Sequence, residues 1–330
     1  MTHTPRKFAL IGAAGFVAPR HMKAIADTGN ELVAALDPHD AVGIMDSYFP
    51  ESAFFTEFER FDRHLEKLRR KGQGVDFVSI CSPNYLHDAH IRFALRIKAD
   101  AICEKPLVLN PWNVDALAEI EKESGFRVWN ILQLRLHPGI IALKEKVASE
   151  LANDPDHIYD IDLTYLTSRG KWYFASWKGS LEKSGSIATN IGIHFYDMLI
   201  WIFGAVQQNT IHIHQHDVAA GLLNLKHAKV RWFLSVNESY LPREALQNGL
   251  RTFRSITVDG QEVEFSGGFT DLHTHSYQEI LEGRGFGLNE AAHSIQTVYH
   301  IRTNPAQGLS DDSHPFCHNV KNERRRFLRE

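Results

Sequence analysis

The sequence predicts an α/β chain in two parts, a doubly wound parallel sheet followed by an α+β domain with a large, mainly antiparallel open sheet. Up to about residue 132, short apolar or β-branched runs alternate with amphipathic stretches, the pattern of parallel strands joined by crossover helices. After the polar cluster at residues 153–156, the strands become long and alternate apolar with polar residues. Hairpin signals there, such as Asp259-Gly260, favour antiparallel pairing.

Five strands and the helices between them make up the first part. The expected strands are residues 8–12, 31–36, 75–81, 101–103 and 128–132. The expected helices are residues 20–27, 57–71, 88–97 and 111–123, the last opening on Asn110-Pro111, a pair suited to a helix start. We place the domain boundary near residue 135, which gives one domain of residues 1–135 and a second of residues 136–330.

The second part alternates strands with a few helices. A helix is expected first, at residues 137–151. The expected strands are residues 157–167, 209–217, 221–225, 229–237, 251–258 and 262–265, and the later helices are residues 191–203, 272–282 and 289–303. The charged end of the chain, residues 321–330, is expected to be solvated.

Composition excludes several classes of protein. A chain of 330 residues with 43% hydrophobic and 23% charged residues belongs with ordinary globular proteins. A net charge of −4 supplies no basic surface for a phosphate backbone, so no nucleic-acid partner is expected. Cys81, Cys103 and Cys317 are odd in number and lack paired spacing, which indicates reduced thiols. With no signal-peptide pattern and no apolar run of membrane-spanning length, we expect a cytoplasmic protein without a membrane partner.

A glycine-rich turn follows the first strand and suggests a dinucleotide site. Residues 12–18 have the spacing Gly-x-x-Gly-x-x-Ala in place of the usual Gly-x-Gly-x-x-Gly. The glycines permit close backbone approach, and the next helix offers amides and a positive dipole end to a pyrophosphate. The alternative is an ordinary tight strand–helix connection. The predicted cofactor contacts in this turn are Gly12, Ala14, Gly15, Phe16 and Val17.

Asp37 stands at the end of the second strand, where a carboxylate can accept hydrogen bonds from an adenosine ribose and repel a 2′-phosphate. This favours NAD over NADP as the cofactor. In the alternative interpretation, Asp37-Pro38 only starts a turn. The loop after the third strand lies on the side of the sheet where ligands bind, so Ser82, Pro83, Asn84 and His87 are expected at the nicotinamide ribose, unless the loop is only a connection.

Glu104 and Lys105 follow the fourth strand directly. Pro106 keeps Lys105 out of helical geometry, so the amine is expected to project into the crevice and, with Glu104, to contact the cofactor. Most lysines are simply solvated, but this one follows a strand at the ligand edge. Burial beside a cationic nicotinamide would lower the pKa of Lys105, so the amine could take a proton or hold a substrate hydroxyl. The sequence therefore predicts a nicotinamide-dependent dehydrogenase acting on a hydroxyl group.

In the second part, Asn190, His194 and Asp197 share one helical face by their spacing. His194 is a candidate acid–base group, although a histidine at a helix start is also a common core residue. The 19 histidines invite a metal site, above all His212, His214 and His216 on one expected strand. Same-face side chains on a strand lie ~7 Å apart, however, whereas zinc ligands lie about 2.1 Å from the metal. We therefore expect no metal, and a solvent or subunit-contact face for these three.

The glycine-rich turn, Glu104-Lys105-Pro106 and the Asn190-x-x-x-His194-x-x-Asp197 pattern resemble the glucose-fructose oxidoreductase / inositol dehydrogenase superfamily, whose members oxidise or reduce carbohydrate hydroxyls with a nicotinamide cofactor. Over longer strings, at residues 8–15, 79–87, 130–135 and 169–173, the chain resembles the UDP-N-acetylglucosaminuronate 3-dehydrogenases. The resemblance implies a Rossmann domain followed by a substrate-binding and oligomerisation domain.

The same resemblance implies an activity: NAD-dependent oxidation at C3 of the sugar of UDP-N-acetyl-D-glucosaminuronic acid. The 3-keto product is transaminated on the way to diacetamido-uronic acids of lipopolysaccharide O-antigen. Some members reoxidise their NADH by reducing 2-oxoglutarate in the same site. The family also implies a homo-oligomer, a tetramer built as a dimer of dimers.

Carried over by position, Lys105 and His194 are the two catalytic groups, and either could be the base. Position 190 is commonly aspartate in the superfamily, whereas Asn190 can orient His194 but cannot stabilise its cation. A diphosphate and a uronate need cations and ring faces, which the loop at residues 168–179 supplies, unless its tryptophans only anchor a strand connection. The expected substrate contacts are Arg169, Lys171, Trp172, Tyr173, Ser176, Trp177, Lys178, Asn190 and His194, with Gln133 and Arg135 as weaker candidates.

Two other functions stay open. The chemistry could act on a free sugar, inositol or another polyol, although cations at Arg169, Lys171 and Lys178 favour a nucleotide sugar. The chain could also be a non-catalytic NAD-sensing regulator, against which both Lys105 and His194 argue.

Overall fold

The computed structural model of the chain describes residues 4–263 and 270–320. Contacts divide the chain into two compact units. The first comprises Met1–Leu136 and Thr270–Ala292, and the second comprises His137–Phe269 and His293–Glu330. The predicted strand at 262–265 lies partly, and the predicted solvated end at 321–330 wholly, outside the described residues.

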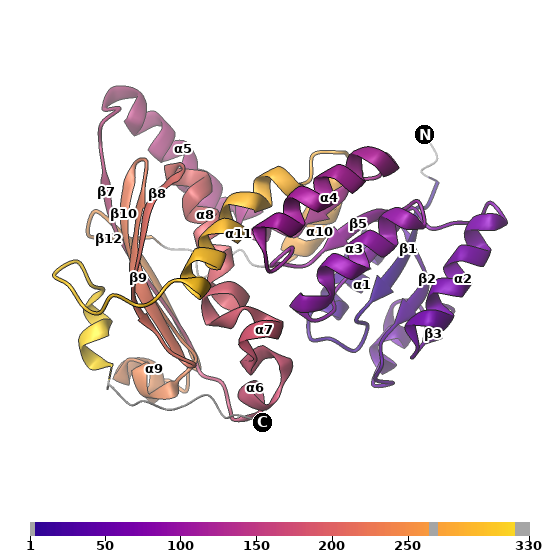
Figure 1. Cartoon of the computed structure of the whole chain (residues 1–330), viewed down its shortest axis with the longest axis horizontal. Helices are drawn as coiled ribbons and strands as arrows, with labels where there is room; N and C mark the ends of the chain where they lie inside the picture. Colours follow the sequence, from indigo (N-terminus) through magenta and orange to yellow (C-terminus); the bar gives the residue numbers. More distant parts are fainter. Residues whose placement is uncertain (1–3, 264–269, 321–330) are drawn as a thin grey trace. The chain divides into compact units, whose positions relative to one another are not determined.

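Six parallel strands form the sheet of the first unit, in the order β3-β2-β1-β4-β5-β6 (Figure 1). They are β1 (Lys7–Ile11), β2 (Glu31–Leu36), β3 (Ala53–Phe55), β4 (Phe77–Ile80), β5 (Asp100–Cys103) and β6 (Val128–Asn130). The crossover helices are α1 (Ala18–Asp27), α2 (Phe58–Arg70), α3 (His87–Arg96) and α4 (Pro111–Ser124). The predicted doubly wound sheet is confirmed. Strand β3 was missed because it is a short edge strand whose residues are only partly buried, so no long apolar run marks it.

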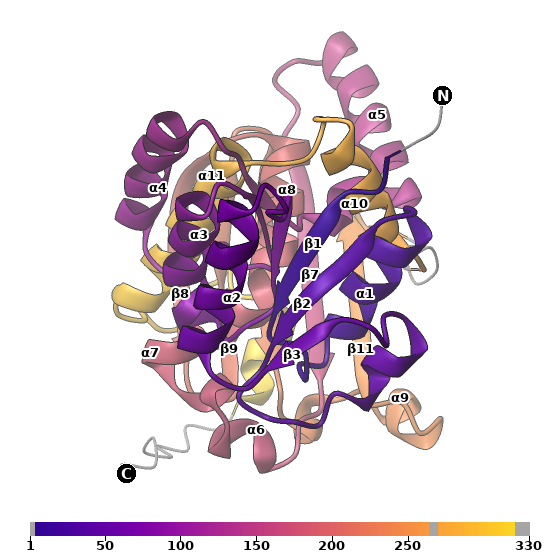
Figure 2. The ribbon, with the colours of Figure 1, turned by 90° about the vertical axis from the view of Figure 1, so that its right-hand side faces the viewer.

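The order of these strands determines where a ligand binds. Strand β1 lies beside β4; the connection after β1 runs to β2 in one half of the sheet, and the connection after β4 runs to β5 in the other half. Figure 2 shows α1 on one face of the sheet and α2, α3 and α4 on the other. In such sheets ligands bind at this switch point, outside the carboxyl ends of the strands. The loops after β1 and β4 lie at that point.

A segment from late in the sequence completes the first unit. Helix α10 (Leu272–Leu281) packs against α1 on the same face of the sheet (Figure 2). Its Tyr277 is fully buried, with its ring 5.8 Å from that of Phe8 in β1. The expected division at residue 135 placed this helix in the second domain. Sequence order alone does not show which core an amphipathic helix joins.

The second unit holds a six-stranded mixed sheet in the order β12-β11-β7-β10-β9-β8. Its strands are β7 (Tyr159–Thr167), β8 (Val206–His214), β9 (Val218–Leu225), β10 (Ala228–Ser235), β11 (Thr252–Val258) and β12 (Gln261–Glu262). Neighbours pair antiparallel except β7 and β10, which are parallel. The predicted, mainly antiparallel sheet is thus confirmed.

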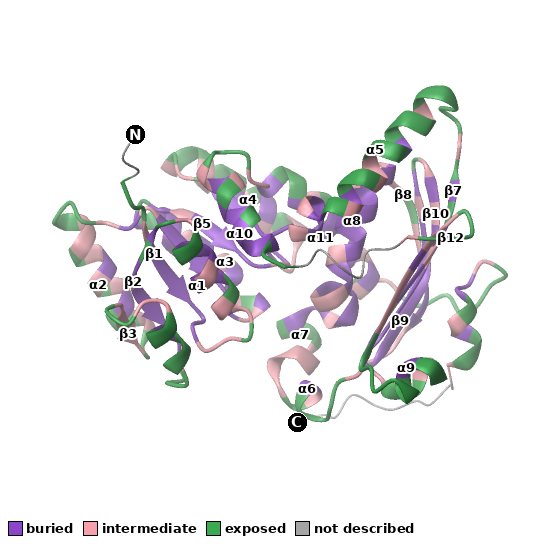
Figure 3. Cartoon of the chain, turned by 180° about the vertical axis from the view of Figure 1, so that it is seen from behind, coloured by how far each residue is buried: buried purple, intermediate pink, exposed green. Residues whose placement is uncertain are grey.

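Both faces of this sheet are covered. On one, helix α8 (Ile193–Phe203) packs Tyr196 against Trp232 of β10, with ring centroids 5.4 Å apart. On the other, Phe233 meets Phe316, which follows α11 (Leu288–Thr303) in the chain, at 5.6 Å. Figure 3 shows the buried strands in purple and exposed residues along the outer helices. Among the described residues, no helix combines the length and the hydropathy needed to span a membrane.

One long helix, α5, and several short helical segments complete the two units. The α-helices are α5 (Pro138–Asn153), α6 (Trp172–Ala175), α7 (Leu181–Ser184) and α9 (Arg243–Gln247). The 3-10 turns are η1 (Gly43–Ser47), η2 (Asn84–Leu86), η3 (Gln133–Leu136), η4 (Trp177–Gly179), η6 (Glu238–Tyr240) and η7 (Pro315–Asn319), and η5 (Ala188–Gly192) is a π-helical turn.

Close packing in the second sheet makes Gly221 a sensitive position. A Cβ there would overlap the Thr210 carbonyl oxygen and lie 2.7 Å from Cζ2 of Trp232. We expect Gly221→Ala to lower the free energy of unfolding of this unit by about 1–3 kcal/mol, since overpacking a filled core costs that much. Urea unfolding followed by tryptophan fluorescence measures it. Gly43→Ala, which meets open space, is the control, and equal unfolding midpoints for all three proteins would contradict the expectation.

Candidate functional site

The glycine-rich turn lies against the loop after β4, and only glycine fits its first position. Gly12 has φ of +92°, and a Cβ there would come within 2.7–2.8 Å of backbone atoms of Cys81 and Ser82. The Gly12 amide donates to the Leu36 carbonyl oxygen at 2.8 Å, and the Gly15 amide donates to the Gly12 carbonyl oxygen at 3.0 Å. The turn is therefore folded tightly between the ends of β1, β2 and β4.

The rest of the turn leaves the start of α1 at the ligand edge. Val17 is the N-cap residue of α1, and no side chain caps this helix. The positive end of the helix dipole suits a pyrophosphate, while the Ala18 and Arg20 amides donate to the Gly15 and Val17 carbonyl oxygens at 3.1 Å and 3.0 Å. Phe16 is 88% exposed, with the Arg20 guanidinium 5.5 Å from its ring centroid. The geometry is that of a dinucleotide-binding turn despite its unusual glycine spacing.

Asp37 is buried at the end of β2 and is bonded to this turn. Its Oδ2 accepts from the Ala14 amide at 2.9 Å, and its Oδ1 accepts from the His39 amide at 2.9 Å. Each carboxylate oxygen can accept a second hydrogen bond. Asp37 therefore shapes the turn, and its contact with an adenosine ribose stays a prediction.

The loop after β4 is held by two histidines. His87 Nδ1 lies 2.7 Å from the Pro106 carbonyl oxygen, and its Nε2 lies 2.8 Å from the Ser82 carbonyl oxygen. The Ser82 hydroxyl lies 2.8 Å from His90 Nδ1. His87 is buried, and burial lowers its pKa. The predicted cofactor residues Ser82 and His87 thus tie the loops after β4 and β5 together, with Pro83 and the buried Asn84 between them.

A buried hydrogen-bonded cluster surrounds Glu104, at the end of β5. His21 Nε2 lies 3.0 Å and His273 Nε2 lies 2.9 Å from the same Glu104 Oε1. The other side of His21 faces Tyr277, whose hydroxyl lies 2.8 Å from His21 Nδ1 and 2.6 Å from the Ser79 hydroxyl. The sequence predicted Glu104 but missed its partners. Nothing in the sequence links His21 or His273 to Glu104, because the contacts span 83 and 169 residues.

The charges in this cluster affect the pKa of the Lys105 amine. Burial raises the pKa of Glu104, but hydrogen bonds from His21 and His273 outweigh it and hold that pKa well below its usual value. Lys105 is half-buried. Burial lowers the pKa of its amine, the neighbouring Glu104 opposes this shift, and Arg20 adds to it. Lys105 is thus closer to the neutral form than an exposed lysine.

His21, Glu104 and His273 are also the three described residues that could together hold a metal ion. Their geometry is that of hydrogen bonds, since both imidazole nitrogens lie at donor–acceptor distance from one carboxylate oxygen. Hydrogen bonding accounts for the cluster without a metal.

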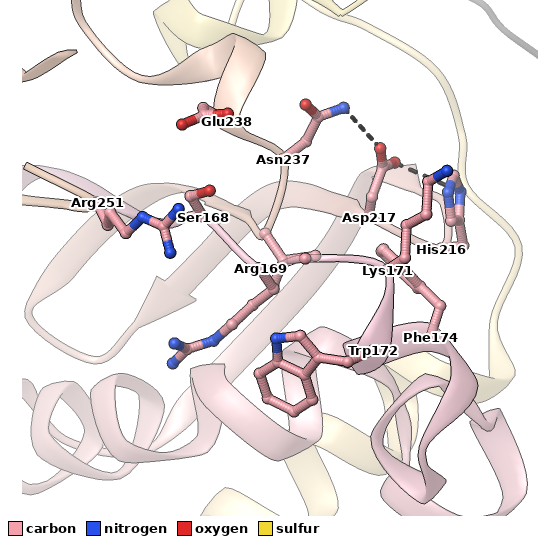
Figure 4. Close-up of a pocket in the computed structure, with 12 residues that line it drawn as sticks. Ser168, Arg169, Lys171, Trp172, Phe174, His216, Asp217, Asn237, Glu238 and Arg251 are labelled. Atoms are coloured by element: carbon pink, nitrogen blue, oxygen red, sulfur yellow. Dashed lines mark hydrogen bonds and ion pairs between the residues drawn. The ribbon is translucent and has the colours of Figure 1, made fainter.

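In the second unit, a cavity of about 400 Å³ opens beside the end of β7 (Figure 4). Arg169 and Arg251 extend along one side, and Lys171 lies with His216 and Asp217 on the other (Figure 4). Three of the predicted substrate residues therefore line a cavity that carries an excess of cationic groups. The full lining is Ser168, Arg169, Gly170, Lys171, Trp172, Phe174, His216, Asp217, Val236, Asn237, Glu238 and Arg251.

Several of these lining residues were not predicted. Asp217 accepts from Asn237 Nδ2 at 2.8 Å and lies 3.4 Å from His216 Nδ1, so it is held away from the arginines. Arg251 directly precedes β11, far from Arg169 in sequence. The Arg169 amide donates to the Val236 carbonyl oxygen at 2.9 Å, which fixes the loop to β10. Strand β11 pairs with β7, with Thr252 opposite Thr167, and this pairing brings the two arginines to the same end of the sheet.

The other predicted residues of this loop lie outside the cavity. Tyr173 is buried, and its hydroxyl accepts from Asn190 Nδ2 at 3.3 Å. The Ser176 hydroxyl donates to the Tyr173 carbonyl oxygen at 2.9 Å and caps η4. Lys178 Nζ lies 4.3 Å from the ring centroid of Trp177. These residues shape the loop, and their contact with substrate stays a prediction.

Asn190 and His194 lie at the junction of η5 and α8. The π-helical turn η5 ends at Gly192 and α8 begins at Ile193, so both side chains are half-buried at a helix start. π-helical turns are frequent at functional sites. Asn190 is held by Tyr173, while Asp197, one turn further on, is buried. His194 belongs to the second unit and Lys105 to the first.

Gln133 and Arg135, the weaker substrate candidates, belong to η3 of the first unit. Arg135 is buried, donates to the Glu290 carbonyl oxygen at 3.1 Å and lies 5.1 Å from the ring centroid of Phe286. It therefore anchors the returning segment.

The expected shared face of the three strand histidines is wrong. The register of β8 shifts between Ile211 and Ile213, which breaks the period of two. His212 is buried, with ring nitrogens 3.3 Å and 3.2 Å from the hydroxyls of Ser310 and Ser313. His216 lies beyond the strand and lines the cavity of Figure 4. A bulge of this kind leaves no mark in the alternation of residue types.

Two family models match the chain. Residues 6–131 match the oxidoreductase family with an NAD-binding Rossmann fold, and residues 157–248 match the C-terminal α/β domain of the same family. Together with the turn and the strand order, these matches define the class: the chain is an NAD-dependent oxidoreductase.

Solved structures make the assignment finer. The WlbA (WbpB) dehydrogenase from Thermus thermophilus, solved with NAD and α-ketoglutarate, is 52% identical with a TM-score of 0.91, over 94% of this chain and 99% of that one. A second structure of the enzyme, with NAD and UDP-GlcNAcA, is 51% identical with a TM-score of 0.90 and the same coverage. The chain therefore belongs to the family of WlbA (WbpB) dehydrogenases.

Curated relatives are more distant. D-glucoside 3-dehydrogenase from Escherichia coli is 26% identical over 218 residues, which is 65% of this chain and 58% of that protein. In six curated relatives, the match covers 16% to 58% of the relative's own length.

The turn generates a prediction about cofactor binding. Gly12→Ala should weaken NAD binding at least about ten-fold, because a Cβ at this φ overlaps the loop after β4 and displaces the turn. Isothermal titration calorimetry with NAD measures the effect. The control is Gly43→Ala, and an unchanged affinity in the folded Gly12→Ala protein would show that the turn does not bind the cofactor.

Proposed function

We propose that this protein oxidises the C3 hydroxyl of the sugar in UDP-N-acetyl-D-glucosaminuronic acid with NAD, giving the 3-keto nucleotide sugar for diacetamido-uronic acid and lipopolysaccharide O-antigen synthesis. One observation carries the proposal: 51% identity over 94% of the chain to a dehydrogenase solved with NAD and UDP-GlcNAcA. The residues of both units fit this chemistry.

In the first unit, Lys105 is suited to accept the hydroxyl proton. Oxidation removes a hydride from C3 and a proton from its hydroxyl, and NAD, when bound, accepts the hydride. Burial lowers the pKa of the Lys105 amine, so its neutral form is easier to reach. We assign proton acceptance to Lys105, with His194 as the second catalytic group and Asn190 as its positioning residue.

In the second unit, the cavity of Figure 4 is suited to a doubly anionic ligand. Arg169 and Arg251 present guanidinium groups, which bind phosphate or carboxylate oxygens in a bidentate manner. The Trp172 ring, 56% exposed, can cover a sugar or a uracil. We infer that this cavity binds the diphosphate or the uronate of the substrate.

Three further features belong to the same proposal. A relative solved with α-ketoglutarate supports 2-oxoglutarate as the oxidant that returns NADH to NAD. We also propose that the protein is cytoplasmic and that it assembles as a homotetramer. Light scattering of the purified protein measures its mass.

The activity assay separates the proposed function from its alternatives. Purified protein with NAD, 2-oxoglutarate and UDP-N-acetylglucosaminuronic acid should yield the 3-keto sugar and 2-hydroxyglutarate, detected by mass spectrometry. Turnover of glucose, inositol or glucoside but not of the nucleotide sugar would move the activity to a free sugar or polyol. Binding of NAD with no turnover of any of these substrates would favour a regulator.

The cavity gives a prediction about affinity. Arg169→Gln and Arg251→Gln should each raise KM for the nucleotide sugar about ten-fold or more, because each removes a charged hydrogen bond worth about 1.5–3 kcal/mol. The affinity for NAD should not change. Steady-state kinetics measures both, with Lys183→Gln, an exposed cation on the neighbouring α7, as the control. If KM stays at the wild-type value in both arginine variants, the cavity is not the substrate site.

A further inference from the structure

The cluster around Glu104 is more elaborate than the proposed function requires. Its two distant members, His273 and Tyr277, come from α10, in the segment that returns to the first unit. Both are buried and both hydrogen-bond within the cluster. Apolar residues alone would suffice to pack α10 against its neighbours. The buried polar contacts of His273 and Tyr277 therefore indicate a further role.

One arrangement of protons accounts for the hydrogen bonds that link these residues. The Ser79 hydroxyl donates to Tyr277 Oη, and the Tyr277 hydroxyl donates to His21 Nδ1. His21 Nε2–H and His273 Nε2–H then both donate to Glu104 Oε1. In this arrangement His21 is neutral, which agrees with its lowered pKa, caused first by burial. Glu104 is the anion that receives the donors.

Glu104 also contacts Lys105 directly. Its second oxygen, Oε2, accepts from the Lys105 amide at 3.2 Å, so one carboxylate bridges the histidines and the residue that we assign to proton acceptance. Asn130 Nδ2 donates to the Cys103 and Glu104 carbonyl oxygens at 2.9 Å and 3.3 Å, which fixes the same backbone from the side of β6. A buried carboxylate stays charged only where such donors replace water.

We propose that His273 is a positioning residue: by donating to Glu104, it holds that carboxylate ionised and fixed beside Lys105, so that the returning segment sets the pH range in which Lys105 accepts the substrate proton. The inference rests on the proposed function for the identity of the reaction. It goes beyond that function because it assigns a role to a residue that contacts neither substrate nor cofactor in our proposal.

Glu104 and Lys105 are surrounded by several titratable groups, and among these Glu104 is the anion that acts on Lys105. Lys105 is influenced by Glu104, by Arg20 of α1 and by His87 of α3. Glu104 faces His21 and His273 and, in addition, Tyr277, Cys81 and Cys103. Burial raises the pKa values of Tyr277, Cys81 and Cys103 well above their usual ranges, so these three stay neutral near pH 7.

The direction of the effect follows from this charge. A nearby carboxylate favours the ammonium form of Lys105, so it raises the pH at which the amine becomes neutral. Loss of the His273 donor makes Glu104 easier to protonate and less well fixed, which weakens that influence. The acid limb of the pH profile of kcat/KM, which reports the free enzyme's base, should therefore move to lower pH.

The experiment uses the full chain and four variants. In Glu104→Gln, where the charge is lost and Oε1 can still accept from both histidines, the acid limb should move down by about one pH unit or more. In His273→Ala it should move in the same direction by less, and kcat should fall about ten-fold. In His273→Gln, whose amide Nε2 can reach the carboxylate, the limb should return toward the wild type. His275→Gln, an exposed histidine on the same helix, is the matched control and should leave the profile unchanged.

A second measurement does not depend on the substrate. The pH dependence of Lys105 acetylation by a trace of acetic anhydride, quantified by peptide mass spectrometry, reports the titration of the amine directly. The apparent pKa from this labelling should follow the same order across the variants. Wild-type protein that does not oxidise the nucleotide sugar would overturn the proposed function, whereas the labelling would still test the role of His273.

Two results would overturn the inference. If Glu104→Gln titrates at Lys105 as the wild type does, the carboxylate does not act on the amine. If folded His273→Ala and His273→Gln share one profile, whether wild-type or shifted, the hydrogen bond from His273 is not the cause. Should His273→Ala fail to fold, His273→Phe, which fills the space of the imidazole but cannot donate, takes its place and should move the limb to lower pH where His273→Gln does not.

Discussion

Burial of the Glu104 carboxylate is the constraint on which the first unit depends. A charge taken out of water at the end of β5 must receive donors from the protein, and His21 and His273 supply them from two helices. The cost of leaving that charge without donors ties α1, β5 and α10 together. The same carboxylate lies beside Lys105. The hydrogen bonds that keep Glu104 ionised in the core therefore also determine the charge next to a candidate catalytic amine.

The two units divide the chemistry between them. The first offers the turn, the start of α1 and the amine that follows β5, all at the carboxyl edge of a parallel sheet. The second offers a cavity at one end of a mixed sheet, where Arg251, just before β11, and Arg169, in the loop after β7, can meet an anionic ligand. Under the proposed function, binding of the cofactor and binding of the sugar nucleotide depend on different residues, which substitutions can separate.

Local patterns were enough to predict much of the fold and some residues of the candidate site. The strands of the parallel sheet, the turn at Gly12 and the position of Lys105 all follow from short runs in which the chemistry is contiguous. Errors arose where the cause was not local. The bulge in β8 places His212 in the interior, where the expected strand face would have left it exposed.

Sequence patterns established the doubly wound sheet, the dinucleotide turn and the residues through which this chain resembles its family, because each is written in neighbouring residues whose spacing has a direct geometric meaning. Which partners those residues receive was settled by folding in three dimensions. His273 reaches Glu104, and Arg251 joins Arg169, across separations that no spacing rule covers. Such contacts depend on which core a helix joins and on how strands pair, and these are properties of the whole fold.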